Sequence, residues 1–237
     1  VAVIGGAKIA DKIEILQRFL DIADAVAVGG AMANTFLHAT GLKVGKSKLE
    51  PDDLPLAKEI MHKVAEVKKE RDFVFYLPQD GVVAKKLDPA APTRIVDWSA
   101  HVIADVEAYP KRPVHEASQV AEDEMILDIG PFSGAFIAGM IQLAETVVWN
   151  GTMGVTETKS LQGPVGPTAH GTELLTEAML GQFGNRPFSI VGGGDTVGFV
   201  QARGLTASFD HVSTGGGASL ELMSGRKLPG VEALENI

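Results

Sequence analysis

Two lysines follow a pair of glycines near the beginning of the chain, in a stretch with helical spacing. The glycines are Gly5 and Gly6, and the lysines, Lys8 and Lys12, stand four residues apart. Residues at that spacing share one face of a helix, and the first helical turn carries the positive end of the helix dipole. Two solvated lysines balanced by nearby acidic residues are the alternative. We favour a phosphate between the two ammonium groups, because glycines allow backbone amides to approach an anion closely.

Three further turns carry residue types that suit the same ligand. In Gly192–Thr196 (GGGDT), glycine amides could face phosphate oxygens while Asp195 binds Mg²⁺, although an aspartate here could equally cap the following helix. Ser213–Ala218 (STGGGA) repeats this arrangement and would aim amide donors at a phosphoryl group in transfer. At a third turn, Asn150 could contact phosphate or base, and Glu157 either accepts hydrogen bonds from ribose hydroxyls or is a solvated charge.

Each of these turns ends or follows a short apolar run, and most of the runs precede a stretch with helical periodicity. This alternation predicts an α/β fold, namely a doubly wound, mostly parallel sheet with helices on both faces, or Rossmann-like three-layer sandwich. Ligands of such sheets bind outside the carboxyl ends of the strands, where the turns converge. The seven runs are Val1–Gly6, Ala25–Gly30, Phe73–Asp80, Met125–Gly130, Val147–Gly151, Phe188–Gly194 and His211–Gly217.

Helices are expected between most of the runs. An amphipathic stripe predicts a helix over Lys8–Ala23, and Pro51 marks the start of another that ends in the charged stretch Lys68–Arg71. Arg94–Asp97 is expected to be a short strand, and Thr156–Thr172, with two Gly-Pro pairs, a loop. Further helices are expected at Phe132–Leu143, Leu174–Leu180, Val197–Ala202 and Ala218–Met223.

Composition excludes several classes of function. The net charge of −9 argues against nucleic acid as a partner, because binding to a phosphate backbone needs a basic surface. The absence of cysteine excludes thiol nucleophiles, thiolate metal sites and disulfides, as fits a cytoplasmic protein. The six histidines have no metal-ligand spacing, and no segment of the sequence is apolar enough to suggest a membrane span. The chain begins with valine inside an apolar run, and we expect it to be a piece of a longer protein.

Taken together, the motifs resemble the carboxyl-terminal, nucleotide-binding domain of phosphoglycerate kinase. Five separated stretches agree in the same order over most of the chain, which is far more specific than the agreement of one. These stretches are Val1–Lys12 (VAVIGGAKIADK), Val28–Leu37 (VGGAMANTFL), Val147–Val155, Ile190–Thr196 (IVGGGDT) and His211–Leu222 (HVSTGGGASLEL), and Leu228–Leu234 (LPGVEAL) is similar to the end of that family's sequences.

The resemblance implies a kinase that transfers a phosphoryl group reversibly between 1,3-bisphosphoglycerate and ADP in glycolysis, with ATP or ADP and Mg²⁺ as cofactors. Lys8 would contact the phosphoryl group in flight, Lys12 the nucleotide phosphates, and Asp195 the metal. The residues implied to take part in catalysis are Lys8, Lys12, Gly194, Gly216 and Gly217. Those implied to bind the nucleotide are Gly29, Gly30 and Leu127 beside adenine, Glu157 at the ribose, and Lys12, Asn150, Gly193, Gly194, Asp195 and Thr196 around the phosphates.

The chain departs from the family's pattern mainly around the base. Ile126 stands where a glycine is usual beside adenine, and Lys48 stands where an apolar residue is usual near the same base. Ala31 replaces a common glycine, and Thr152 replaces proline in the turn after Asn150. These departures bear on adenine affinity and base preference more than on the phosphate chemistry.

In this family a separate amino-terminal domain holds the acceptor, 3-phosphoglycerate, and that domain is absent from residues 1–237. We therefore expect one nucleotide-binding domain, monomeric, that binds Mg-nucleotide but transfers phosphate negligibly on its own. Two other classes of protein remain as alternatives. A nicotinamide-dependent dehydrogenase domain would need an acidic residue after the second run, where Gly29 and Gly30 stand, and a non-catalytic module would bind nucleotide without turnover.

Overall fold

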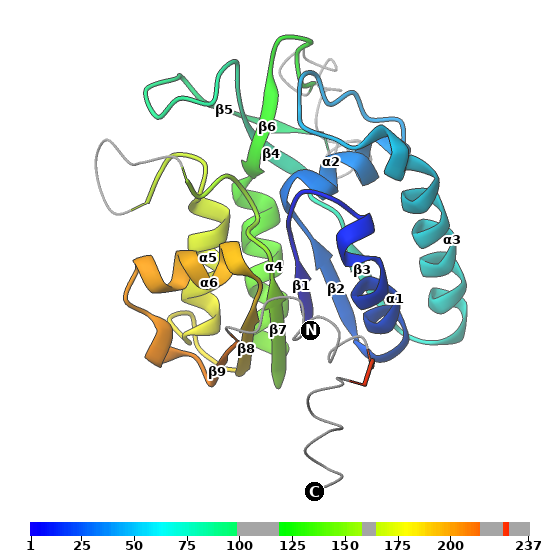
Figure 1. Cartoon of the computed structure of the whole chain (residues 1–237), viewed down its shortest axis with the longest axis vertical. Helices are drawn as coiled ribbons and strands as arrows, with labels where there is room; N and C mark the ends of the chain where they lie inside the picture. The colour runs from blue at the N-terminus through cyan, green and yellow to red at the C-terminus, as the bar shows by residue number, and fades with distance from the viewer. Residues whose placement is uncertain (99–118, 158–164, 214–224, 228–237) are drawn as a thin grey trace, which may run out of the picture.

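The computed structural model describes residues 1–98, 119–157, 165–213 and 225–227. Its largest element is a six-stranded sheet in the order β3-β2-β1-β7-β8-β9, in which every neighbouring pair of strands is parallel (Figure 1). The strands are β1 (Ala2–Ile4), β2 (Ala25–Val28), β3 (Val74–Tyr76), β7 (Thr146–Asn150), β8 (Phe188–Gly192) and β9 (His211–Val212). Six of the seven apolar runs supply these strands, as predicted.

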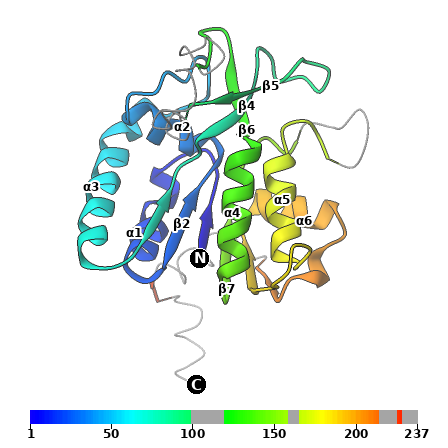
Figure 2. The same ribbon diagram turned by 180° about the vertical axis from the view of Figure 1, so that it is seen from behind.

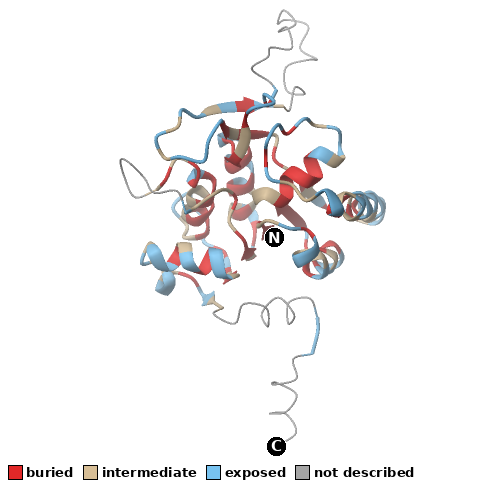
Figure 3. Ribbon diagram, turned by 45° about the horizontal axis from the view of Figure 1, so that its top comes forward, coloured by how far each residue is buried: buried red, intermediate tan, exposed pale blue. Residues whose placement is uncertain are grey.

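Helices cover both faces of the sheet. Side chains alternate along a strand, so Ile4 belongs to the core beneath α1, α2 and α3, while Val3 belongs to the core beneath α4, α5 and α6. Seen from behind, α4 and α5 lie in front of the strands (Figure 2), and buried residues concentrate between the layers (Figure 3). The predicted doubly wound α/β sandwich is confirmed. The helices are α1 (Ile13–Ile22), α2 (Gly30–Ala39), α3 (Leu54–Glu70), α4 (Pro131–Leu143), α5 (His170–Met179) and α6 (Gly194–Ala202).

The strand order reverses between β1 and β7. The chain moves outward from β1 to β2 and β3 on one side, and outward from β7 to β8 and β9 on the other. The two strands are in register up to their carboxyl ends, where Ile4 pairs with Asn150. Because crossover connections are right-handed, the chain leaves β1 and β7 toward opposite faces and a crevice opens between the two turns. This edge is therefore where the fold is expected to bind a ligand.

A second, three-stranded sheet stands at the carboxyl edge of the first (Figure 1). It is antiparallel, in the order β5-β4-β6, and consists of β4 (Asp80–Ala84), β5 (Arg94–Asp97) and β6 (Met125–Ile129). The prediction that Met125–Gly130 belongs to the main sheet is wrong, because its strand pairs with β4. The prediction of one strand over Phe73–Asp80 is also wrong, since Pro78, which has no N–H to donate, separates β3 from β4. The short strand Arg94–Asp97 is confirmed.

The first helix begins later than predicted. A 3₁₀ turn covers Ala10–Lys12 and α1 begins at Ile13, so Lys8 precedes every helical residue and does not share a helical face with Lys12. The physical reason is a buried carboxylate, because Asp53 Oδ2 accepts the N–H groups of Ile9 and Ala10, at 2.9 and 3.2 Å, and caps the turn there.

A second buried aspartate caps α4 in the same way from the other sheet. Asp80 accepts the N–H groups of Phe132 and Ser133 at 2.9 and 2.8 Å, and the Ser133 hydroxyl at 2.6 Å. The other expected helices are present, although the predicted loop Thr156–Thr172 is too long because α5 already begins at His170. The expected helix Ala218–Met223 lies outside the described residues. No helix in the described ranges is long and apolar enough to cross a membrane.

Candidate functional site

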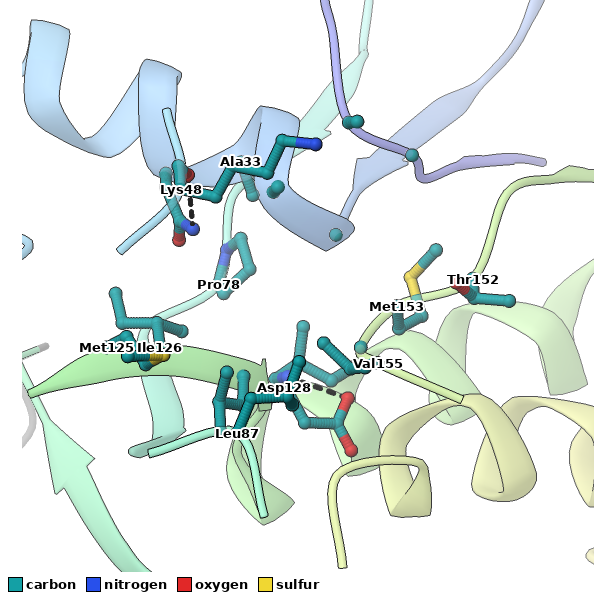
Figure 4. Close-up of a pocket in the computed structure, with 18 of the residues that line it drawn as sticks. Ala33, Lys48, Pro78, Leu87, Met125, Ile126, Asp128, Thr152, Met153 and Val155 are labelled. Carbon is teal, nitrogen blue, oxygen red and sulfur yellow. Dashed lines mark hydrogen bonds between the residues drawn. The ribbon is translucent and has the colours of Figure 1, made fainter. Parts of the chain in front are cut away.

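A cavity of about 470 Å³ opens where the strand order reverses. The turns after β1, β2, β3, β7 and β8 line it, together with β6 of the second sheet (Figure 4). Most of the lining side chains are apolar, as is usual for small-molecule sites. The charged residues that line it are Lys46, Lys48, Asp128, Glu157 and Asp195.

Four glycine-containing turns form what we call the turn cluster, and the backbones of the first three touch. They are Gly5–Lys8, Gly29–Gly30, Gly151–Gly154 and Gly193–Asp195. A Cβ on Gly5 would lie 2.2 Å from the carbonyl oxygen of Thr152, and one on Gly30 would lie 2.6 Å from the amide nitrogen of Gly6. Both distances are shorter than any real contact of a Cβ. These glycines therefore allow the turns after β1, β2 and β7 to pack on one another.

A lysine and an asparagine meet between the turn that precedes α1 and the end of β7. Lys12 Nζ donates a hydrogen bond to Asn150 Oδ1, which joins the end of β7 to the turn before α1. Burial lowers the pKa of Lys12 from 10.5 to about 8, against the opposing effects of Asp195 and Asp11. The Nδ2 of Asn150 is buried and has no hydrogen-bond partner among the described residues. A desolvated cation and an unused donor thus lie together, and both would gain from an anion.

The turn after β8 completes this group. Gly193 has φ +88°, and a Cβ there would lie 2.9 Å from Asn150 Oδ1, so a side chain would be strained as well as crowded. Gly194, the first residue of α6, is exposed and has open space where a Cβ would stand. Thr196 is buried, and its Oγ1 accepts the N–H of Gly151 at 2.7 Å, which ties this turn to the one after β7. The start of α6, whose first N–H groups have no partner within the helix, is therefore open at Gly194.

Opposite the turns stands the β6 wall, formed by Met125–Ile129. A shift in the pairing of β4 with β6 leaves Leu127 opposite no residue of β4, and such bulges re-aim side chains near sites. Asp128 is buried; its Oδ2 accepts the N–H of Gly171 in α5 at 2.8 Å, and its Oδ1 that of Ile129 at 2.9 Å. Burial raises the pKa of Asp128 from 3.8 to about 8, although these hydrogen bonds oppose the rise.

The cavity's remaining edge is a loop segment, Lys46–Lys48, which we call the rim. It joins the β6 wall to α2, because Ser47 Oγ accepts the N–H of Ile126 at 2.8 Å and Asn34 Nδ2 donates to the carbonyl oxygen of Lys48 at 3.0 Å. Figure 4 shows Lys48 on the α2 side of the cavity and Ile126 on the opposite side. The rim therefore connects α2 to Ile126 at one end of the cavity, and Asp128, which contacts α5, lies two residues farther along β6.

Comparison with known proteins identifies the family. The family model of phosphoglycerate kinase matches residues 1–226. The chain belongs to the phosphoglycerate kinase family. It is 42% identical over 236 residues to the phosphoglycerate kinase of Chloroflexus aurantiacus and 43% identical over 235 residues to that of Desulforapulum autotrophicum. These matches cover 100% and 99% of this chain but 52% of each relative, so the chain spans about half the length of the curated relatives it matches.

Solved structures agree with this assignment. The structure of phosphoglycerate kinase from Coxiella burnetii superposes with a TM-score of 0.81 at 34% identity, covering 99% of this chain and 52% of that one. The enzyme from Pyrococcus horikoshii gives a TM-score of 0.72 at 28% identity, covering 99% and 51%. Membership of the phosphoglycerate kinase family argues against the alternative of a nicotinamide-dependent dehydrogenase domain.

The structure brings together most of the residues that the sequence analysis proposed. Four of them, Gly30, Leu127, Glu157 and Asp195, line the cavity itself. The contacts described above bring together, next to the lining residue Asp195, five residues that do not line the cavity themselves: Lys12, Asn150, Gly193, Gly194 and Thr196. Gly29 lies behind the lining and packs on Met153, whose Sδ would be 2.4 Å from a Cβ there. Lys8 is exposed and lies in the turn after β1 without lining the cavity. Gly216 and Gly217 lie outside the described residues.

Sequence reasoning gave too little weight to Asp128. It is not among the candidate site residues of the sequence analysis, yet in the structure it accepts an N–H group of α5 and lines the cavity. Two glycines leave room for its carboxyl group, because a Cβ on Gly154 or Gly171 would lie 2.3 or 2.6 Å from Asp128 Oδ1. No pattern in the sequence connects residues so far apart.

Proposed function

We propose that this chain is the half of a phosphoglycerate kinase that binds Mg-ATP or Mg-ADP, and that the whole enzyme transfers a phosphoryl group reversibly between 1,3-bisphosphoglycerate and ADP. The observation that carries the proposal is the pair formed by Lys12 and Asn150. A half-buried ammonium with its pKa lowered to about 8, beside a buried donor that no described residue satisfies, is costly unless an anion completes the site.

The nucleotide phosphates would lie between this pair and the start of α6. Asn150 Nδ2 would donate to a phosphate oxygen, and Lys12 would supply a positive charge beside it. The N–H groups of Gly193, Gly194 and Asp195 would donate from the positive end of the α6 dipole. A phosphoryl group in transfer needs such fixed donors more than it needs covalent chemistry, so positioning is the chain's contribution to the reaction.

A magnesium ion fits this end of the cavity as a companion of the nucleotide. Among the described residues no three His, Cys, Asp or Glu side chains gather closely enough to hold a metal ion. Mg²⁺ usually takes one or two carboxylates together with phosphate oxygens and water, and Asp195 is an exposed carboxylate at the right place for that arrangement. When bound, the ion would neutralise charge on the phosphates. Asp195 would orient it.

The other proposed contacts follow the length of the cavity. Glu157 would accept hydrogen bonds from the ribose, while Gly30 and Leu127 would border the base, with Gly29 supporting them through Met153. Lys8, Gly216 and Gly217 are proposed to contact the transferring group. The acceptor, 3-phosphoglycerate, and the closure that brings it to the donor would come from the other half of the enzyme, which accounts for the 52% coverage of the relatives.

Calorimetric titration with MgADP tests this function. The chain is expected to bind it, and Lys12→Ala is expected to weaken binding by about 1.5–3 kcal/mol, or roughly 10- to 150-fold, as is typical for a hydrogen bond to a charged group. Lys43→Ala serves as the matched control, because Lys43 is exposed and lies outside the cavity lining. Equal binding by the Lys12→Ala variant would remove the assignment of Lys12, and absence of binding by the unaltered chain would remove the proposed function.

A further inference from the structure

The backbone of the rim is held on both sides of the cavity. Lys46 N donates to the Glu124 carbonyl oxygen at 2.7 Å, and the Ser47 and Lys48 hydrogen bonds tie the same three residues to Ile126 and Asn34. Asn34 and Ser47 are both buried. The position of the Lys48 backbone is therefore fixed by polar contacts to α2 and to the β6 wall at once.

The side chain of Lys48 brings a charge to this fixed position. It lines the cavity and runs along the α2 side, where its ammonium group points toward the turn that follows β1 (Figure 4). In the described part of the chain Lys48 forms no ion pair, since the salt bridges found there involve other residues. The walls on either side of it are apolar, from Ala33 on α2 to Ile126 and Leu127 on β6. Lys48 itself is exposed, and its ammonium group beside these walls can donate to a ligand group that accepts hydrogen bonds.

We propose that Lys48 makes this site prefer a 6-oxopurine nucleotide, with guanine or hypoxanthine as the base, over an adenine nucleotide. This inference rests on the proposed function, which puts the base between Gly30 and Leu127, the lining residues next to the rim. A lysine ammonium has three donors and no acceptor. A 6-oxopurine offers it two neighbouring acceptors, O6 and N7, whereas adenine presents an amino group, itself a donor, beside N7.

The position of Lys48 relative to Lys12 suits this assignment. The place proposed for the phosphates, beside the start of α6, already has its own cation, Lys12, which donates to Asn150. Lys48 is bonded to Asn34 of α2, and its neighbour Ser47 is bonded to Ile126 of the β6 wall, so Lys48 lies between the two elements that would border the base. Because ADP, GDP and IDP carry the same phosphates, any general attraction of Lys48 for a polyphosphate cancels when the three affinities are compared.

The test is calorimetric titration of the chain with MgADP, MgGDP and MgIDP, repeated for Lys48→Leu and for the control Lys43→Leu. A lysine contact to O6 and N7 distinguishes bases by roughly 5- to 100-fold, and the exposure of Lys48 favours the lower end, about tenfold. MgGDP and MgIDP are therefore expected to bind about tenfold more tightly than MgADP. Lys48→Leu should bring the ratio close to one by weakening GDP and IDP, and Lys43→Leu should leave it unchanged.

The outcomes separate this inference from the proposed function. If MgADP binds as tightly as MgGDP and MgIDP or more tightly, the inference is overturned while nucleotide binding stands. If Lys48→Leu weakens all three nucleotides equally, Lys48 acts on the phosphates and the base preference is again overturned. If none of the three binds, the proposed function fails and the inference fails with it.

Discussion

The two sides of the cavity are built by different physical means. The turn cluster consists of local turns whose glycines let backbones touch, as in the 2.2 Å that would separate a Gly5 Cβ from the Thr152 carbonyl oxygen. The β6 wall and the rim are held by side chains from distant parts of the chain, such as Ser47 with Ile126 and Asp128 with Gly171. The turn cluster depends on glycines, whose lack of a side chain lets the turns approach closely. The β6 wall and the rim depend on a few buried polar contacts.

This difference has a consequence for function. Backbone packing at the turn cluster leaves little room for variation, and this is the side where phosphates are proposed to bind. The β6 wall keeps its place through individual hydrogen bonds, so a lining residue such as Ile126 or Lys48 can differ without disturbing the turns. Phosphate binding and base preference are therefore separable properties of this site, and the following predictions test that separation.

The largest expected effect is on the rate of phosphoryl transfer, because neither side of the cavity, in the described part of the chain, offers a site for the acceptor. Among the residues that the structure describes, no arginine lines the cavity, and Arg94, Arg186, Arg203 and Arg226 each pair with a carboxylate. The chain alone is expected to turn over ATP and 3-phosphoglycerate at least about 10⁴-fold more slowly than a full-length relative, because positioning two substrates supplies most of the rate. A coupled assay for ADP release measures this. Turnover within tenfold of the relative would contradict the division of labour between the halves.

Gly5→Ala tests how tightly the turn cluster is packed, because it adds a methyl group where the turns touch. The new Cβ would meet backbone atoms of Gly151 and Thr152, which cannot rotate away, so a loss of about 3 kcal/mol or more in the free energy of unfolding is expected. Urea unfolding measures the loss. Gly139→Ala is the matched control in α4, where a Cβ has open space, and it should raise stability by about 0.5–1 kcal/mol. Similar effects of the two substitutions would be evidence against tight packing of the turns.

Asp128 tests the β6 wall through pH. Its pKa is about 8 in the folded chain and 3.8 when unperturbed, so the folded chain retains a proton that the unfolded chain releases. The contribution of Asp128 to stability is complete below about pH 4 and is lost as the pH rises toward 8, by up to about 1.4 kcal/mol per pH unit. Asp128→Asn removes this dependence, so its stability relative to the unaltered chain should rise between pH 5 and pH 8. A difference that stays constant over this range would contradict the raised pKa.

The sequence was a good guide to the turn cluster and a poor one to the β6 wall, for a physical reason. Apolar runs ending in glycines report short-range features, and they predicted the parallel sheet and the convergence of its turns, where Lys12, Asn150 and Gly193 meet. The run Met125–Gly130 looks like any other buried strand, and only the pairing of β6 with β4 shows that it belongs to another sheet. The late start of α1 depends on Asp53, which is far from Ile9 in sequence and could not be inferred from local spacing.

Ser47→Ala is expected to have the smallest effect of the series. It removes the acceptor of the Ile126 N–H and leaves the rim attached on that side only through Lys46 and Glu124, at a cost of about 1 kcal/mol in stability. MgADP affinity should fall only a few-fold, because the phosphate contacts remain. Thermal unfolding and calorimetry measure the two quantities. A loss of MgADP binding as large as that of Lys12→Ala would show that the two sides of the cavity are not separable.

The most direct measurement of the central claim is the titration of the Lys12 amino group itself, followed by NMR of chain labelled in its lysine side chains and assigned with Lys12→Met. In the free chain its pKa is expected at about 8. A bound polyphosphate stabilises the ammonium form, so saturating MgADP should raise this pKa by about one unit or more. An unchanged pKa in the saturated chain would mean that the nucleotide phosphates bind elsewhere.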